Sequence, residues 1–318
     1  MSRWTYRHGL HELGKGLYAY LQPDGSWGWS NAGLVRDGEE ALLVDTLFDR
    51  HLTADMLAVM RDATGLSPRD IGTLVNTHAN GDHTYGNGLL PEAEILASEA
   101  GAREMEEVPP EVLANMMRMA PELGAYFVHC FGRFDFEGLE TRTPTKTFSG
   151  RLPVSVGDKR VELIEVGPAH TRGDVLVHVP SDRVIYTGDI LFIDGTPIMW
   201  EGPVENWIAA CDLILSLDLE AIVPGHGPIT DKAGVARVRA YLVHVEAEAR
   251  KRHEAGLDWK EAARDIALGD YESWLDSERI AVNVATLYRG FGAFDTAPPI
   301  GEVWGLMAEL EQRARRRR

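Results

Sequence analysis

Residues 76–87 read NTHANGDHTYGN, and this stretch decides the fold of the chain. Two histidines and an aspartate, His78, His83 and Asp82, fall within six residues, with glycines close by. Imidazole and carboxylate groups are the ligands that hold a divalent metal where thiolates are absent. Glycine lets the backbone turn tightly and approach an ion. The stretch therefore predicts a metal-binding loop.

Three further candidate ligands occur in the same setting later in the chain. His170 lies in GPAHTRGD, Asp189 in YTGDILF and His226 in VPGHGP, each just past an apolar, strand-like segment. Sites of α/β folds gather where strands end, so these side chains are expected to converge with the first loop. The shared placement indicates one metal-binding constellation.

The remaining pattern predicts an α/β fold. Short apolar or alternating runs bounded by Gly and Asp are typical of strands, and apolar residues at helical spacing are typical of amphipathic helices. The strand-like runs are 16–21, 29–36, 41–46, 71–77, 151–156, 160–167, 174–180, 183–189 and 221–227. The helical runs between them are 51–64 and 208–217. The chain thus has two halves that each alternate between strand and helix.

Two segments fall outside this alternation. Residues 99–148 carry helical patterns rich in Met and Phe, which predict either core packing or a flexible lid over an apolar substrate. Residues 231–318 also read as helical, with Ile280, Val284 and Leu287 forming one apolar stripe that must be buried. This extension is expected to cap the pocket or to form a homodimer surface.

Composition narrows the possible partners. The 318 residues carry a formal net charge of −17, which argues against nucleic acid because phosphate binding needs a concentrated basic face. No run approaches the roughly 20 apolar residues of a membrane span, and no signal peptide is evident, so the expected location is the cytoplasm. Cys130 and Cys211 lack CxxC spacing, which indicates neither disulfides nor a thiolate zinc site. The expected partner is a small-molecule substrate.

The ordered set of motifs resembles the metallo-β-lactamase superfamily. The string THxxGDHxxG at 77–86 is followed in order by GPAHTRGD, TGD and PGHG. The resemblance implies an α/β fold of the four-layer αββα sandwich type, with a metal site at the edge of the two sheets. It covers about residues 15–230. We therefore expect 1–230 to form a metallo-β-lactamase-like domain and 231–318 a C-terminal helical extension packed on it.

The resemblance also implies a ligand set for two metals. The ligands are His78 and His170 for the first metal, Asp82, His83 and His226 for the second, and Asp189 as the bridge. The usual first motif of the family is HxHxDH, and Asn80 stands where its middle histidine would be. An amide oxygen is a weaker zinc ligand than imidazole. Either Asn80 ligates weakly or orients a metal-bound water, or only the second position is filled, or the first position holds iron.

The function that the resemblance implies is a metal-dependent hydrolase. One or two zinc ions, with iron or manganese as other candidates, would supply a metal-activated hydroxide, and Asp82 would ligate and orient this nucleophile. The first alternative is a mononuclear non-haem iron dioxygenase that uses His78, His170 and Asp189, like the sulfur dioxygenases of the same superfamily. The second alternative is a catalytically silent metal-binding or regulatory protein.

Aromatic residues near the motifs suggest the substrate class. Turns that the fold would place around the metal carry Trp27, Trp29, Phe192 and Trp200, which could form an apolar wall. Tyr85 is a candidate for a hydrogen bond that supports the metal site or for one to the substrate. An apolar ester, thioester or lactone is the expected substrate, whereas a β-lactam or a phosphodiester fits the acidic composition and the expected location less well.

Overall fold

The computed structural model describes residues 4–119, 121–294 and 297–317, and these residues form two sheets. The first sheet has the strand order β1-β2-β3-β4-β5-β6-β7, in which β1 to β4 are antiparallel and β4 to β7 are parallel. Its strands are β1 Gly9–Gly14, β2 Leu17–Leu21, β3 Ala32–Asp37, β4 Glu40–Val44, β5 Thr73–Val75, β6 Glu94–Ser98 and β7 Lys146–Phe148.

The second sheet has the order β12-β11-β10-β9-β8. Neighbouring strands are antiparallel except for β11 and β12, which are parallel. Its strands are β8 Arg151–Val156, β9 Lys159–Glu165, β10 Val175–Val179, β11 Val184–Tyr186 and β12 Ala221–Val223. Strands β9, β11 and β12 therefore run in one direction, and their carboxyl ends lie at one edge of the sheet.

Side-chain alternation explains how the two sheets pack. In β4, Leu42 and Val44 face the second sheet, while Ala41 and Leu43 face the opposite way. The outer face of the first sheet packs on helix α1 (Arg50–Thr64), which begins at Asp49, where the carboxylate accepts a hydrogen bond from Leu52 N at 2.8 Å. Central strands such as β4 and β10 bury residues on both faces because each sheet lies between the other sheet and helices.

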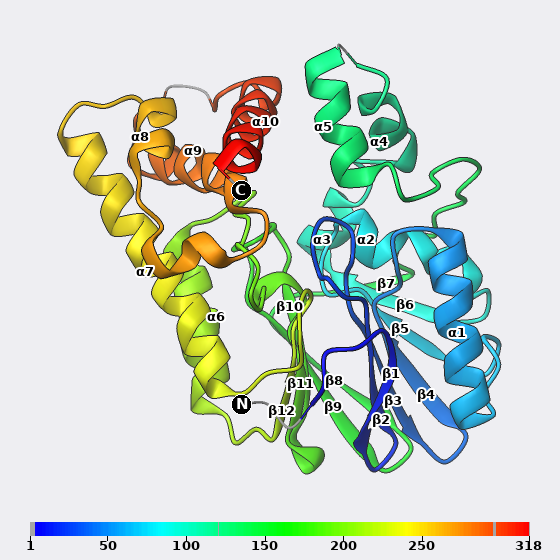
Figure 1. Cartoon of the computed structure of the whole chain (residues 1–318). Coiled ribbons are helices and arrows are strands. Elements are labelled where there is room, and N and C mark those ends of the chain that lie inside the picture. The colour runs from blue at the N-terminus through cyan, green and yellow to red at the C-terminus, as the bar shows by residue number, and fades with distance from the viewer. Residues whose placement is uncertain (1–3, 120, 295–296, 318) are drawn as a thin grey trace.

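The outer face of the second sheet packs on α6 (Val204–Ser216) and α7 (Lys232–Glu254). Figure 1 shows α1 on one outer side of the paired sheets and α6 and α7 on the other. These layers are the four-layer αββα arrangement that the sequence predicted, and the fold class is confirmed. In the described part of the chain, none of the helices has both the length and the hydropathy needed to cross a membrane.

The Met- and Phe-rich segment is helical over only part of its predicted length. It contains α3 (Glu99–Glu104), α4 (Pro110–Met116) and α5 (Pro121–Phe131), but its end forms β7. The prediction of a helical segment through residue 148 was therefore wrong at this end. The strand has three residues and pairs in parallel with β6, so its sequence is too short to show a periodicity of its own.

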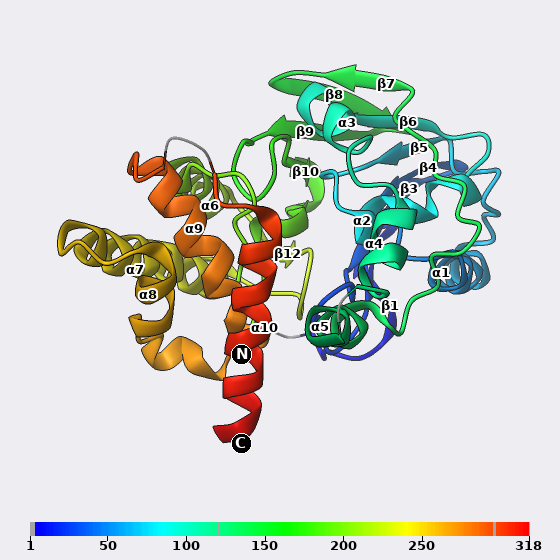
Figure 2. The same cartoon turned by 90° about the horizontal axis from the view of Figure 1, so that it is seen from above.

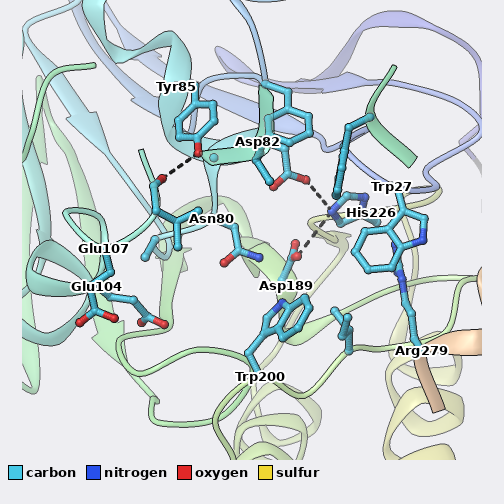
Figure 3. Close-up of a pocket in the computed structure, with 18 of the residues that line it drawn as sticks. Trp27, Asn80, Asp82, Tyr85, Glu104, Glu107, Asp189, Trp200, His226 and Arg279 are labelled. Carbon is cyan, nitrogen blue, oxygen red and sulfur yellow. Dashed lines mark hydrogen bonds and ion pairs between the residues drawn. The ribbon is translucent and has the colours of Figure 1, made fainter. Parts of the chain in front are cut away.

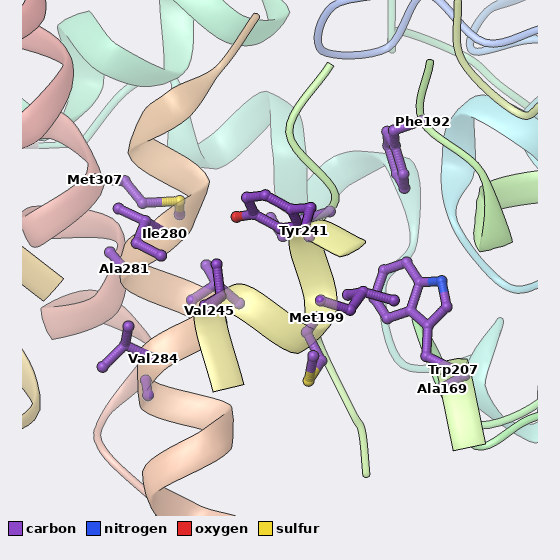
Figure 4. Close-up of a cluster of buried hydrophobic side chains, with 14 of the residues drawn as sticks. Ala169, Phe192, Met199, Trp207, Tyr241, Val245, Ile280, Ala281, Val284 and Met307 are labelled. Atoms are coloured by element: carbon purple, nitrogen blue, oxygen red, sulfur yellow. The ribbon is translucent and has the colours of Figure 1, made fainter. Parts of the chain in front are cut away.

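The C-terminal extension continues from α7 through α8 (Trp259–Asp265), α9 (Ile280–Gly290) and α10 (Ile300–Arg317), with short 3₁₀ turns at Gly269–Ser273 and Ser277–Arg279. Ile280, Val284 and Leu287 are buried within the same chain, in the cluster that also contains the outer face of the second sheet. Figure 4 shows Ile280 and Val284 of α9 facing Val245 of α7. The stripe is thus covered without a second chain, and the homodimer stays a prediction.

One buried amide ties the extension to the body of the protein. Asn283 accepts a hydrogen bond from Met199 N at 2.7 Å and donates to the Pro197 carbonyl at 2.8 Å and the Tyr241 hydroxyl at 2.9 Å. Met199 belongs to the loop that follows Asp189. Seen from above in Figure 2, α10 lies between the other helices of the extension and α5.

Candidate metal centre

The six predicted ligands meet at the carboxyl edge of the sheets and are all buried. They form two groups, each with ligand atoms within 4.8 Å of one another. The first group is His78, His170 and Asp189, and the second is Asp82, His83 and His226. Between the groups, Oδ2 of Asp189 lies 3.3 Å from Nε2 of His170 and 3.4 Å from Nε2 of His226. The residue that the resemblance places as a bridge therefore lies between the two groups.

Strand ends position these residues. His78 follows β5, Asp189 follows β11 and His226 follows β12. Two glycines allow the close approach of these loops: a Cβ atom at Gly225 would collide with Oδ1 of Asp189, and Gly188 has a φ of +49° beside Thr77. A larger residue at Gly188 of the TGD motif or at Gly225 of the PGHG motif would thus be sterically excluded.

Hydrogen bonds fix the orientation of each imidazole. Nδ1 of His83 contacts Asp45 Oδ2 at 2.9 Å, and Nδ1 of His78 contacts Thr77 Oγ1 at 3.0 Å. Because the Thr77 hydroxyl donates its own hydrogen to Asp45, it accepts the Nδ1–H of His78.

The other two rings donate Nδ1–H to backbone carbonyls. His170 donates to the Ile198 carbonyl at 2.6 Å and His226 donates to the Gly25 carbonyl at 3.1 Å. In the neutral form of each of the four rings, the lone pair is therefore on Nε2, the nitrogen that faces the other ligands.

The donor set fits a divalent cation. Among the described residues, Nε2 of His78 is buried without a hydrogen-bond partner, and Nε2 of His83 and Oδ1 of Asp189 lie 3.1 Å apart without the geometry of a hydrogen bond. Buried polar atoms without partners are costly, and a metal ion would satisfy them. The combination of imidazole nitrogens and carboxylate oxygens suits zinc, iron or manganese.

Charges in the centre perturb its acid–base equilibria. Burial would raise the pKa of Asp189, but the imidazoles of His226 and His83 hold this pKa well below its usual value. Burial lowers the pKa of His226, yet the carboxylates of Asp189 and Asp82 outweigh burial and raise it to about 9. Protons held between imidazole and carboxylate take the place of a cation, so metal binding is expected to release protons.

Asp45 is a residue of the centre that sequence reasoning missed. Its buried carboxylate accepts hydrogen bonds from His83 Nδ1 and from both the backbone nitrogen and Oγ1 of Thr77, the last two at 2.7 Å. Through Thr77 it also reaches His78, so one carboxylate orients a ring in each group. The sequence feature that could have identified Asp45 is its position directly after strand β4, at the sheet edge where the motifs also lie.

Asn80 lies beside the first group. Its Nδ2 is 3.2 Å from Nε2 of His170, which must accept because Nδ1 of that ring donates to Ile198. The two ends of an amide are interchangeable by a flip. With the amide flipped, Oδ1 would lie beside Nε2 of His170, where both atoms could bind the first metal ion.

A cavity of about 380 Å³ opens over the centre. Figure 3 shows Asn80, Asp82, Asp189 and His226 between Glu104 and Glu107 on one side and Trp27 and Arg279 on the other. Much of the wall is apolar or aromatic. These lining residues are Trp27, Phe48, Tyr85, Val108, Leu113, Met116, Phe131, Phe192, Ile198, Trp200, Ile300 and Trp304.

Sequence comparison identifies the family. Residues 25–226, more than half of the chain, match the family model of the metallo-beta-lactamase superfamily. The chain belongs to the metallo-beta-lactamase superfamily. The family resemblance that the sequence motifs indicated is thereby confirmed. The C-terminal helices lie outside the matched residues.

Individual members of the metallo-beta-lactamase superfamily resemble the chain at low identity. The alpha subunit of 2,4-dinitroanisole O-demethylase from Nocardioides sp. (strain JS1661) is 29% identical over 50% of this chain and 41% of that protein. Acyl-coenzyme A thioesterase MBLAC2 from Gallus gallus is 22% identical over 62% of this chain and 72% of that protein.

A solved structure shows the same fold. The sec-alkylsulfatase Pisa1 from Pseudomonas sp. has a TM-score of 0.68 and 15% identity, over 90% of this chain and 50% of that one. The chain thus spans half or less of the length of the alkylsulfatase and of the O-demethylase subunit.

Four of the five predicted substrate-binding residues line the cavity of this superfamily member. Trp27, Tyr85, Phe192 and Trp200 do so. Trp29 is not part of the lining, and its ring instead packs on Phe134 with centroids 4.9 Å apart. Its predicted substrate contact is therefore corrected to loop packing, because the chain turns between the two tryptophans of GSWGWSN and directs only the first to the cavity.

Tyr85 lies in the cavity wall, and its predicted hydrogen bond to a substrate stays a prediction. Its hydroxyl donates a hydrogen bond to the Val108 carbonyl at 2.8 Å. The ring lies in the wall while the hydroxyl ties the metal loop to the segment between α3 and α4. The hydroxyl hydrogen is thus donated to the protein, while the hydroxyl oxygen can still accept a hydrogen bond from a substrate.

Proposed function

We propose that this member of the superfamily is a metal-dependent hydrolase of apolar, uncharged esters, thioesters or lactones. The observation that carries the proposal is the convergence of four imidazole Nε2 atoms with Asp82 and Asp189 beneath a largely apolar cavity. Zinc is the proposed metal, with one or two ions per chain.

A cation in this centre would lower the pKa of a bound water from about 15.7 to about 7 and polarise the carbonyl under attack. Asp82, with 8% exposure, is the most exposed of the six ligands, and its carboxylate lines the cavity. We assign to it the role of orienting the attacking water and accepting its proton. The aromatic wall would exclude other water from the scissile bond.

Charge at the mouth supports an uncharged substrate. Among the described residues, two guanidinium groups belong to the lining: that of Arg172 lies beside Glu104, Glu107 and Glu201, and that of Arg279 is buried and paired with Asp276 at 2.9 Å. Arg172 already binds Glu107 through two hydrogen bonds of 2.6 and 2.7 Å. A phosphate-bearing thioester carrier needs cationic groups with free donors, and the mouth offers no surplus of them. The coenzyme A thioester named for the avian relative is therefore not the substrate we propose here.

The cavity lining also suggests what each segment of the chain contributes. We propose that residues 1–230 form the metallo-hydrolase unit and that α4 and α5 act as a lid. The support is that Leu113 and Met116 of α4 and Phe131 of α5 line the cavity. The extension of 231–318 also contributes lining residues from α10.

A mononuclear iron dioxygenase is the second candidate. His78, His170 and Asp189 by themselves form a group of two imidazoles and one carboxylate, the facial triad of non-haem iron enzymes. Elemental analysis of the purified protein separates the candidates. Zinc bound at one to two equivalents is expected, whereas one equivalent of iron with negligible zinc would support the dioxygenase.

Substitution of Asp82 tests the hydrolase directly. Asp82→Ala should reduce kcat for benzyl acetate by at least about 100-fold, because it removes both a ligand and the proposed proton acceptor. Asp62→Ala, at an exposed carboxylate on α1, is the control and should leave turnover unchanged. Undiminished turnover in a folded Asp82→Ala protein would remove the proposed mechanism.

A further inference from the structure

Trp304 of α10 is the contribution of the extension to the wall of the cavity. It lies outside residues 25–226, which match the family. Its side chain is largely buried and contacts five other aromatic rings. These are Trp27, Trp200, Tyr126, Phe127 and Phe131.

The contacts of Trp304 join three separate segments of the chain. The ring centroid lies 5.6 Å from Trp27, which precedes β3, and 5.6 Å from Trp200, in the loop after Asp189. It lies 4.8 Å from Phe127 on α5. We call Trp27, Trp200 and Trp304 the indole wall. All three residues line the cavity over the metal centre.

The extension also fixes the orientation of the indole wall. The Trp27 Nε1–H donates to Oε1 of Glu278 at 3.1 Å, and the Arg279 guanidinium lies 4.2 Å from the centroid of the Trp27 ring. Helix α10 is held by Arg264, whose two hydrogen bonds to Glu309 measure 3.0 and 2.7 Å. The wall is therefore preorganised, which reduces the entropy cost of binding a flat ligand.

Geometry favours an aromatic ring as the ligand of this wall. The indole of Trp304 is tilted by 39° against Trp27 and by 40° against Trp200, so the wall presents ring faces and edges at inclined angles. Aromatic rings gain from offset and edge-to-face contacts beyond the area that they bury. A saturated ring of similar size lacks this gain.

We propose that Trp304 is a specificity-determining residue that selects substrates with an aromatic ring in their apolar part. The proposal rests on the hydrolase function above and specifies its substrate class. The reaction is unchanged: the ester bond breaks, water supplies the hydroxyl of the acid, and the alcohol leaves with the remaining proton. Trp304 acts on the choice of substrate and not on the chemical step.

The test compares benzyl acetate with cyclohexylmethyl acetate, which differ in the aromaticity of the ring. The metal-loaded wild-type enzyme is expected to prefer benzyl acetate by at least about 10-fold in kcat/KM, which is the scale of discrimination by apolar pockets. Trp304→Leu should reduce this ratio by about 10-fold, mainly through KM, and Trp304→Phe should retain most of it. Trp274→Leu, at a buried tryptophan outside the cavity lining, is the matched control and should keep the wild-type ratio.

A binding measurement separates this proposal from the hydrolase function. Benzyl alcohol and cyclohexylmethanol are titrated into the metal-loaded protein while the indole N–H resonances are followed, and the Trp304 signal is assigned by its loss in Trp304→Phe. Benzyl alcohol should shift this signal at lower concentration than cyclohexylmethanol. That result without any ester hydrolysis would retain the aromatic site and refute the hydrolase.

Two outcomes would overturn the proposal. One is an unchanged substrate ratio in a folded Trp304→Leu protein. The other is equal binding of the two alcohols in the wild type, which does not depend on any variant folding.

Discussion

Replacing Asp45 with asparagine is expected to weaken metal binding while the fold is kept. The carboxylate accepts one hydrogen bond from His83 at 2.9 Å and two from Thr77 at 2.7 Å. Asparagine has one acceptor oxygen and an NH₂ group, so at least one of these bonds is lost. A hydrogen bond to a charged group contributes about 1.5–3 kcal/mol, which corresponds to about 10- to 100-fold in zinc affinity if the loss falls on His83.

The assay is a competition titration of zinc between the protein and a chromogenic chelator. Asp49→Asn is the matched control, because Asp49 is also buried and caps α1, a task that asparagine performs well. The control should bind zinc like the wild type. Equal zinc affinity in Asp45→Asn and the wild type, or equal losses in both variants, would refute the reasoning.

Three further predictions concern other parts of the site. Asn80→His should raise zinc binding towards two ions per chain at limiting metal, since imidazole is the stronger ligand; an unchanged binding isotherm would count against a weak first position. Tyr85→Phe removes the hydrogen bond to the Val108 carbonyl, so amide hydrogen exchange between α3 and α4 should quicken, and identical rates would exclude this tie. Burial raises the pKa of Glu278 to about 7, so the folded state binds more protons than the unfolded state between about pH 4 and 7, and stability should fall as pH rises through that window. Between pH 5 and 8 the free energy of unfolding of the wild type, measured in urea, should fall by about 1–3 kcal/mol, and this fall should be absent in Glu278→Gln. An unaltered pH dependence in the variant would disprove the prediction.

The sequence predicted elements with a clear local signal. Strand β8 is found at the predicted residues 151–156, and α1 begins one residue before the predicted helix at 51–64. The six candidate ligands were recognisable because each follows an apolar strand at the same edge of the fold. Their convergence within the described structure follows from that topology.

Features that depend on distant contacts could not be predicted in this way. Strands β1 and β7 lie at the two edges of the first sheet, and their pairing with neighbours gives them their conformation. Asp45 carries no motif, and its role depends on Thr77, 32 residues away. Trp304 reaches the cavity only because α10 packs across α5 and the loop of Trp200.

The central claim is that the six clustered side chains hold the catalytic zinc of a hydrolase. Anomalous diffraction from crystals of the purified protein, recorded at the zinc and iron absorption edges, tests it most directly. The account predicts a zinc peak among Asp82, His83 and His226, with or without a second zinc beside His78 and His170. An iron peak alone beside His78 and His170, or no metal peak at either group, would contradict it.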